Sequence, residues 1–576
     1  MKNNLKKKFN FIAIICIVIF SVTLSQKTLQ NDTFYTIKIG EHIVNTKKID
    51  MEDPFSLHEG LKYTYPHWLY DTGMYIIYNT GEHLATNFGI ENETGGLTAI
   101  YISTIIFAII LGISIYITNI KISNNHIISF ILTLGVLYCL KNFIAARAQL
   151  VTYLCFTFEI LFIEQLLKTG KKRYGIGLII IAILIANLHA AVWYMFFILT
   201  LPYFAETLCI KLMESNLSCK LKIRVINKKI AKLKKKLELN EFNENADYIT
   251  RKIEILTKKI EDLNILKEKR DNAAKKMENN SFRFNFLKRN NIKLLIIFVV
   301  ICVFTGLLTP QTSFEPYTYI IKTLKGNSTS FISEHLPTVL IESSEALVIL
   351  VIISIMLIFT DTKVSLKDIF MLAGLTIMTL MSRRHLALLA LIGVYSLNII
   401  IWNFIKKDDK DVSENKLLNK ITTPFGVAVI VLLAILCGVS FYGTKYKEGY
   451  IDEQSYPVGV AEYLNNNLEK DKIRIYNSYN FGSYLLYKDI PVFVDSRCDL
   501  YTPEFNEKDI VADALDIEGL NVYYEDMFKQ YSITHIITYD DSRLKMMLEH
   551  DDNYKIIYQD DNFYLFERVM IHEGEN

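Results

Sequence analysis

The chain has 576 residues, of which 51% are hydrophobic and 12% aromatic, a composition that excludes a soluble protein of this length and indicates a polytopic membrane protein. The net charge of +2 conceals a strong asymmetry. Residues 211–290 carry 22 Lys or Arg against 11 Asp or Glu, whereas residues 441–576 carry 13 against 27. We therefore expect these two regions on opposite sides of a membrane.

Long apolar segments predict membrane-spanning helices, because about 17 to 25 helical residues cross a bilayer. There are eleven: 9–25, 97–118, 127–144, 148–167, 175–188, 190–208, 292–309, 344–360, 368–382, 385–404 and 423–442. With this count, the lysines and arginines of the short loops fall on one side, which predicts a cytoplasmic N-terminus and an extracytoplasmic C-terminus. A cleaved signal peptide at the first segment is an open alternative, and it leaves the next loop outside as well.

The N-terminal membrane region, 1–210, contains an outward loop at 26–96. Its aromatic stretch from Tyr63 to Tyr78 predicts short amphipathic helices at the membrane interface, with Trp68, Tyr70 and Tyr75 as anchors. The second membrane region is 291–442.

Between the two membrane regions, residues 211–290 show apolar residues that step by three and four. These are Ile226, Ile230, Leu233 and Leu237, and then Ile249, Ile253, Leu256, Ile260 and Leu263. The period predicts an antiparallel helical (coiled-coil) hairpin in the cytoplasm, broken at 240–245. Its basic surface suits anionic lipid head groups or a partner, and a merely solvated helical face is the alternative.

The acidic tail, 443–576, alternates helical and strand patterns, which predicts a small extracytoplasmic α/β domain. We expect strands at 473–476, 492–494, 535–538, 556–558 and 563–566, and helices at 460–468 and 523–531.

Polar residues recur where spans end on the outer side. Arg147 lies between the third and fourth spans, Asn187 and His189 between the fifth and sixth, and Arg383 and Arg384 between the ninth and tenth. A charge inside a span costs about 2.5 to 3.5 kcal/mol, so such residues usually serve function. Each could instead snorkel or pack, but their shared side favours a common pocket.

The outward loop adds carboxylates at Asp32, Glu52 and Asp53. Glycosyl transfer to a hydroxyl needs a carboxylate that accepts the proton, and a phosphate leaving group needs cations or a metal. Arginine suits phosphate because its planar fork donates two hydrogen bonds at once. The two sets together are what glycosyl transfer on the outer side would need, although loop carboxylates are often simply solvated.

At these positions the sequence resembles the GT-C glycosyltransferase superfamily, in particular bacterial relatives of dolichyl-phosphate-mannose-dependent protein mannosyltransferases. The resemblance rests on Asp32, Asp53 to Ser56, His67 to Leu69, Arg147 to Gln149, Asn187 to His189, Glu334-His335, Arg383 to His385, Asn477 to Leu485 and, most specifically, Val492 to Tyr501. It implies a polyprenyl-phosphate-linked sugar donor bound between spans at the outer leaflet, and inverting transfer to an extracytoplasmic glycan or protein.

Under this hypothesis Asp32 is the base, and Glu52 or Asp53 is a second carboxylate or the ligand of a divalent metal ion. The predicted substrate contacts are Arg147, Gln149, Asn187, His189, Glu334, His335, Arg383 and Arg384. Membrane lipids are expected partners, and nucleic acid is not.

Two other classes stay open. A transporter or flippase for lipid-linked saccharides would also use buried arginines, but it should show two related halves, which the sequence lacks. A membrane scaffold would dock through the hairpin and the acidic tail. Deletion of 215–285 would separate these hypotheses, because a scaffold should fail and an enzyme should keep its chemistry.

Overall fold

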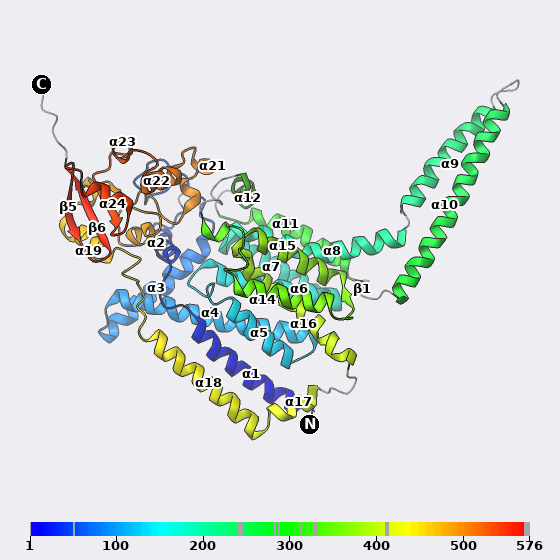
Figure 1. The fold of residues 1–576 in the computed structure, drawn as a ribbon, viewed down its shortest axis with the longest axis horizontal. Helices are drawn as coiled ribbons and strands as arrows, with labels where there is room; N and C mark the ends of the chain where they lie inside the picture. The colour runs from blue at the N-terminus through cyan, green and yellow to red at the C-terminus, as the bar shows by residue number, and fades with distance from the viewer. Residues whose placement is uncertain are drawn as a thin grey trace.

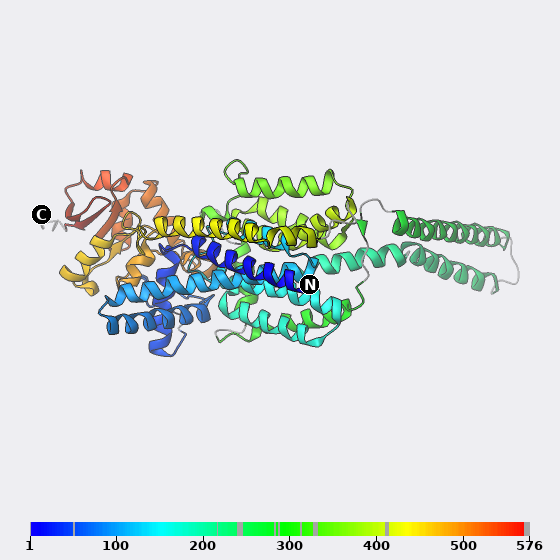
Figure 2. The ribbon, with the colours of Figure 1, turned by 90° about the horizontal axis from the view of Figure 1, so that it is seen from below.

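The computed structural model describes the whole chain except residues 1, 50–51, 216, 239–245, 281–283, 286–288, 311–313, 326–331, 409–413 and 570–576. Figure 1 shows three parts: a bundle of long helices, a helical hairpin at one end of it, and a unit with a small sheet at the other. Figure 2 shows the same order of parts from below.

Each of the eleven predicted spans coincides with a helix. These are α1 (Lys2–Leu24), α4 (Asn92–Ser123), α5 (Ile127–Cys139), α6 (Ala148–Thr169), α7 (Lys172–Leu188), α8 (Trp193–Ser215), α11 (Ile292–Val303), α14 (Ser344–Ile358), α15 (Leu366–Met381), α16 (Leu386–Asp408) and α18 (Pro424–Lys445). Within the described residues, six stretches are long and apolar enough to cross a membrane: 4–24, 92–123, 148–169, 190–212, 383–406 and 424–445. The multi-pass class is therefore confirmed, and the count of eleven stays a prediction.

The bundle packs around α4, which contacts α1, α5, α6 and α16. Residues such as Leu111, Ile115 and Leu391 are fully buried there. By contrast, α18 packs along α1 and exposes apolar side chains, among them Leu432 and Leu436. This is the surface expected of a helix that faces lipid, where exposed apolar groups cost nothing.

The predicted hairpin is present as α9 (Leu217–Glu238) and α10 (Ala246–Asn280), which pack against each other. The predicted break at 240–245 lies outside the described residues. After the hairpin, β1 (Phe284–Asn285) pairs in parallel with β2 (Val364–Ser365).

The C-terminal unit is built on a four-stranded sheet in the order β3-β4-β6-β5. The strands are β3 (Ile475–Tyr476), β4 (His535–Tyr539), β5 (Tyr554–Gln559) and β6 (Phe563–Arg568). β3 and β4 are parallel, and β6 runs antiparallel to both of its neighbours. The predicted strand at 492–494 is wrong: that stretch is buried, but it pairs outside the sheet through a single bridge between Val492 and Ser56.

Short helices surround this sheet: α19 (Val458–Asn467), η5 (Lys470–Lys472), α20 (Gly482–Tyr487), η6 (Cys498–Tyr501), α21 (Pro503–Asn506), α22 (Ile510–Gly519), α23 (Tyr524–Gln530) and α24 (Arg543–Leu548). The helices predicted at 460–468 and 523–531 correspond to α19 and α23. The alternation of helices and strands confirms the small α/β character of the tail.

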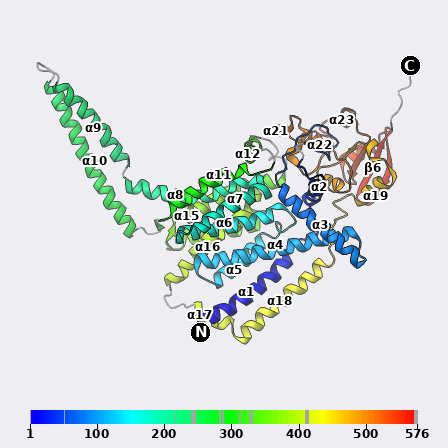
Figure 3. The same cartoon turned by 180° about the vertical axis from the view of Figure 1, so that it is seen from behind.

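The outward loop and the tail share a core. The loop folds into α2 (Asn31–Thr46) and α3 (Trp68–Phe88), and α2 packs against α20 of the tail. Side chains from both segments, such as Tyr35 and Ile39 with Tyr476 and Phe493, are buried in one cluster. Figure 3 shows α2 and α3 beside the C-terminal unit from behind. The two regions therefore pack as one body above the bundle.

This packing corrects the interface helices predicted for 63–78. Most of that stretch belongs to the 21-residue helix α3. Tyr70 is buried, and the Trp68 indole donates a hydrogen bond to Asn187 Oδ1 at 3.1 Å. Both aromatic side chains therefore bind protein, because the C-terminal unit covers the surface that the sequence alone would leave to lipid.

A buried ion cluster joins loop and tail. Arg497 pairs through Nη1 with Asp53 Oδ1 at 2.5 Å and through Nη2 with Asp495 Oδ2 at 2.6 Å, and all three side chains are fully buried. The Tyr501 hydroxyl donates a further hydrogen bond to Asp495 Oδ2 at 2.7 Å. The guanidinium of Arg497 is thus the counter-charge for two buried carboxylates, those of Asp53 and Asp495.

Replacing Arg497 with Met should strongly destabilise the protein. The variant leaves Asp53 and Asp495 buried without their counter-charge, which typically costs about 3 to 5 kcal/mol. We expect a clear drop in the midpoint of thermal unfolding of the detergent-solubilised protein. Glu52→Gln, at the exposed neighbour of Asp53, should change stability by less than about 0.5 kcal/mol. Equal midpoints for Arg497→Met and wild type would contradict the structural role of the cluster.

Candidate functional site

A cavity of about 590 Å³ lies where the bundle meets the body formed by loop and tail. Seven of the predicted site residues line it: Asp32, Arg147, Gln149, His189, Glu334, His335 and Arg384. They come from segments more than 350 residues apart in the chain, which the fold brings to one place.

Helix breaks at the same end of the bundle position several of these side chains. Arg147 is the N-cap of α6, and His189 is the C-cap of α7, just before the short helix η1 (Ala190–Val192). α15 ends at Met381, and η4 (Arg383–His385) leads into α16. A helix that stops here places its last side chains in the cavity and not within the helix packing.

Arg147 lies between two carboxylates. Its Nη2 is 2.5 Å from Asp32 Oδ2, at the start of α2, and its Nη1 is 3.1 Å from Glu334 Oε1, in η3 (Ser333–His335). Burial alone would raise the pKa of Glu334, but the positive charges of Arg147 and Arg384 outweigh it and hold that pKa below its usual value. Two carboxylates, those of Asp32 and Glu334, therefore face the cavity beside an arginine.

Arg384 is the second cation of the cavity. It donates a hydrogen bond from Nη1 to Nε2 of His335 at 3.0 Å, an arrangement that requires the imidazole nitrogen to be unprotonated. Burial, together with the charge of Arg384, lowers the pKa of His335 to about 4. In the part of the chain that the structure describes, no carboxylate lies within ion-pair distance of Arg384, so its charge is available to an anion.

His67 and Tyr35 also line the cavity, and neither was predicted to be a site residue. Nδ1 of His67 lies 2.7 Å from Asp71 Oδ1, and its Nε2 lies 3.0 Å from the Tyr35 hydroxyl. Burial opposes protonation of His67, but the carboxylate of Asp71 raises its pKa above the usual value. The spacing of four residues at the start of a helix was the signal that could have revealed this pair.

Asp499 is another residue that lines the cavity. Its carboxylate accepts a hydrogen bond from the Tyr319 hydroxyl, in α12 (Glu315–Lys325). Burial raises the pKa of Asp499. Asp495 and Arg497 belong to the buried cluster, and Arg497 also reaches the cavity wall.

Four predicted site residues do not line the cavity. Glu52 is exposed, and the oxygens of Asp53 are taken by Arg497 and by the backbone amide of Ser56 at 2.8 Å. Asn187 is buried in packing contacts and donates to the carbonyl oxygen of Leu308 at 3.2 Å. Arg383 turns away from its neighbour and pairs with Glu342 at 3.1 Å.

The donor set gives no support to a metal ion at the positions predicted from sequence. Among the residues that the structure describes, no group of three or more His, Cys, Asp or Glu side chains is arranged to hold one. Both carboxylate oxygens of Asp53 already have partners, Arg497 and the backbone amide of Ser56, and Glu52 points to solvent.

No protein-family model matches the chain, and no curated protein sequence matches it. Solved structures do. The chain is similar to the archaeal oligosaccharyltransferase AglB from Archaeoglobus fulgidus in complex with an inhibitory peptide and a dolichol-phosphate, with a TM-score of 0.50 and 10% identity over 92% of this chain and 69% of that one. It is also similar to the apo form of the oligosaccharyltransferase from this organism, with a TM-score of 0.51 and 11% identity over the same shares.

At this identity the likeness is one of fold. In fold, the chain therefore agrees with the predicted resemblance to membrane glycosyltransferases.

Because the pKa of His335 is lowered in the folded protein, the stability of the protein should depend on pH. His335 stays neutral in the folded protein down to about pH 4, whereas a free histidine takes up a proton near pH 6.5. Between these values the unfolded chain binds more protons, so His335 makes the protein less stable as the pH falls. The thermal midpoint of wild type relative to His335→Gln should therefore decrease from about pH 6.5 towards pH 4. It should stay constant above about pH 7.5, and a difference that does not change with pH would contradict the neutral imidazole.

Proposed function

We propose that this protein is a membrane glycosyltransferase that moves a sugar from a polyprenyl-phosphate-linked donor to an acceptor on the side of the C-terminal unit. The observation that carries the proposal is the cavity, in which Arg384, Arg147 and two carboxylates lie together at one end of the helical bundle. The fold supports it, because a protein of that fold binds a dolichol-phosphate and a peptide.

The proposed reaction is a single displacement. A nucleophilic group of the acceptor attacks the anomeric carbon, the bond from that carbon to the phosphate oxygen breaks, and the configuration inverts. The polyprenyl phosphate leaves with the bonding electrons, and the acceptor loses a proton to a carboxylate. The site must therefore supply a base on one side of the sugar and positive charge on the other.

Asp32 is the proposed base. Its carboxylate faces the cavity from the start of α2, and Arg147 holds it in place through the 2.5 Å ion pair. Glu334 holds the other side of Arg147, which makes Arg147 both a positioning residue and a positive charge close to the reaction. Glu52 and Asp53 do not enter this assignment, because neither reaches the cavity.

Arg384 is the proposed contact for the donor phosphate. Its guanidinium already donates one hydrogen bond to His335 and keeps further N–H groups for a phosphate oxygen. His189 and Gln149 also line the cavity and complete the polar wall. The Thr152 hydroxyl lies 3.0 Å from His189 Nδ1 and fixes the orientation of that ring.

The direct test is release of free polyprenyl phosphate by the purified protein. The protein is incubated in lipid with candidate polyprenyl-phosphate sugars and with glycan or peptide acceptors, and the lipid products are separated by chromatography. Acceptor-dependent release supports transfer. Movement of intact donor between leaflets without any release would instead support a transporter.

Asp32→Asn should lower the rate of release by roughly 100-fold or more, since a positioned base contributes 10² to 10⁴. The substitution keeps the size of the side chain, so membrane insertion should stay close to wild type, and the unfolding midpoint should fall because Arg147 keeps only its pair with Glu334. Glu52→Gln, which removes a carboxylate of the same loop outside the cavity, should retain the wild-type rate. Full activity in Asp32→Asn would remove Asp32 as the base.

Two adjacent arginines provide a matched pair of variants for the phosphate contact. Arg384→Ala should lower donor affinity or turnover by roughly 10- to 100-fold, the usual effect of losing a hydrogen bond to a charged group. Arg383→Ala should change either by less than about threefold, because its guanidinium pairs with Glu342 outside the cavity. Steady-state rates against donor concentration measure both, and the reverse order of effects would contradict the assignment.

A further inference from the structure

The helical hairpin is fixed to the bundle at its root. Glu206, in α8 just before the hairpin, accepts a hydrogen bond from Nε of Arg289, just after it, at 2.9 Å. Lys367 at the start of α15 pairs with Glu164 at 3.2 Å and donates its backbone N–H to Glu206 Oε1 at 3.3 Å. α10 also contacts α8. These charges lie well inside the protein, so the hairpin leaves the bundle from a rigid base.

The hairpin runs across the direction of the bundle helices and does not continue it. In Figure 1, α1 and α18 descend from upper left to lower right, whereas α9 and α10 rise steeply to the right. Figure 3 shows the same crossing from behind. A bilayer normal that follows α1 and α18 therefore leaves the hairpin lying along the membrane surface. In both views α9 is on the side towards the bundle, and α10 is on the far side.

The helix on the membrane side carries the charge. α9 has nine Lys or Arg against one acidic residue, whereas α10 has nine against seven. The seam of α9 against α10 is formed by residues at steps of three and four, Cys219, Ile223, Ile226, Ile230 and Leu233. On the opposite face the same stepping gives Leu221, Arg224, Lys228, Lys232 and Lys235, all of them exposed.

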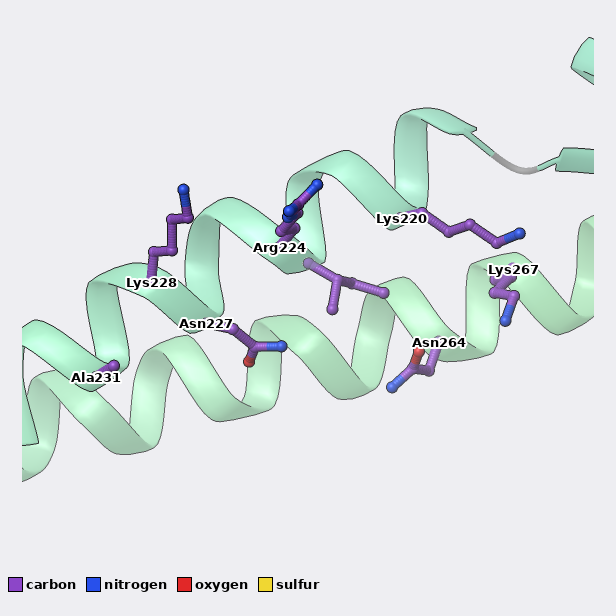
Figure 4. A pocket seen from close by; sticks show the side chains of 8 residues that line it. Lys220, Arg224, Asn227, Lys228, Ala231, Asn264 and Lys267 are labelled. Carbon is purple, nitrogen blue, oxygen red and sulfur yellow. The ribbon is translucent and has the colours of Figure 1, made fainter.

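Figure 4 shows this division at close range. Arg224 and Lys228 point away from α10, whereas Asn227 lies towards it, next to a groove between the two helices. None of the four cations Arg224, Lys228, Lys232 and Lys235 lies within ion-pair distance of a carboxylate in the described part of the chain. Exposed Leu221 and Val225 border this face at the edge of a second groove between α9 and α10.

We propose that the outer face of α9 binds anionic phospholipids of the leaflet opposite the C-terminal unit. This is the cytoplasmic leaflet under the predicted orientation. A basic helix that lies flat on a membrane attracts anionic head groups, and a few apolar side chains at its surface enter the head-group layer. The alternating charges on the far face of α10, Arg251, Glu254, Lys258 and Asp262, suit water.

The proposal is independent of the catalytic assignment, because the hairpin and the cavity lie at opposite ends of the bundle. It also explains the unequal charge of two helices of one hairpin. A solvated hairpin would need no such difference between its faces.

Lysine footprinting of the full-length protein tests the proposal. The protein is placed in nanodiscs of phosphatidylcholine alone or with one third phosphatidylglycerol, treated briefly with an amine-reactive acetylating reagent, and digested for mass spectrometry. Lys228, Lys232 and Lys235 should react several-fold more slowly in the anionic discs, and about 1 M salt should restore their reactivity by screening. Lys258 and Lys269 on α10 provide the comparison within the same molecule and should react equally in both discs.

Matched variants separate the helix face from total charge. Arg224, Lys228, Lys232 and Lys235 are changed together to Gln in one variant, and Arg251, Lys252, Lys258 and Lys259 in the other. Lys229 of α9, which is unchanged in both variants, should lose its response to anionic lipid in the first variant and keep it in the second. Equal reactivity of the α9 lysines in both discs, or equal protection of α9 and α10, would overturn the proposal. An effect that requires added nucleic acid or a soluble protein would overturn it as well.

Discussion

The geometry of the cavity depends on one arginine held between two carboxylates. Asp32 and Glu334 lie on either side of Arg147, and these three residues stand at the start of α2, at the start of α6 and in the loop after α12. A largely buried guanidinium is stable only where carboxylates accept its hydrogen bonds, so the three segments must meet. The ion pairs fix the distance between the helical bundle and the body above it.

The same arrangement explains why the site is polar on one side and apolar on the other. The bundle contributes charged and imidazole side chains where α6, α7 and α15 start or end, and it contributes apolar ones such as Phe156, Met378 and Leu388 to the rest of the wall. An amphipathic donor with an anionic head and a hydrocarbon tail matches such a wall, because its head can meet the arginines while its chain stays in lipid.

Much of this fold can be predicted from sequence, because the length of apolar runs and the three-and-four spacing depend on local geometry. The convergence of Arg147, His189 and Arg384 followed from the shared side of three helix breaks. The positions of the carboxylates in the outward loop were harder to predict from the sequence. Adjacent residues in extended backbone point to opposite faces, so Asp53 enters the core and Glu52 faces water.

Adjacent side chains on a tight helical turn also point in different directions. In η4, Arg384 lines the cavity, whereas Arg383 pairs with Glu342 outside it. The hydrogen bond between Tyr319 and Asp499 joins segments 180 residues apart, and no local pattern indicates it. The packing of the tail against the outward loop was not predicted, for the same reason. It depends on surfaces that come together only when the chain folds.

The core shared by the outward loop and the tail also constrains how the protein is made. Translation produces α2 and α3 early, while their partners β3, α20 and Arg497 emerge last. Until the final segment is made, the apolar faces of the early helices lack the residues that cover them in the folded protein. A protein cut short after α18 would therefore keep its long apolar helices and still lack one wall of the cavity.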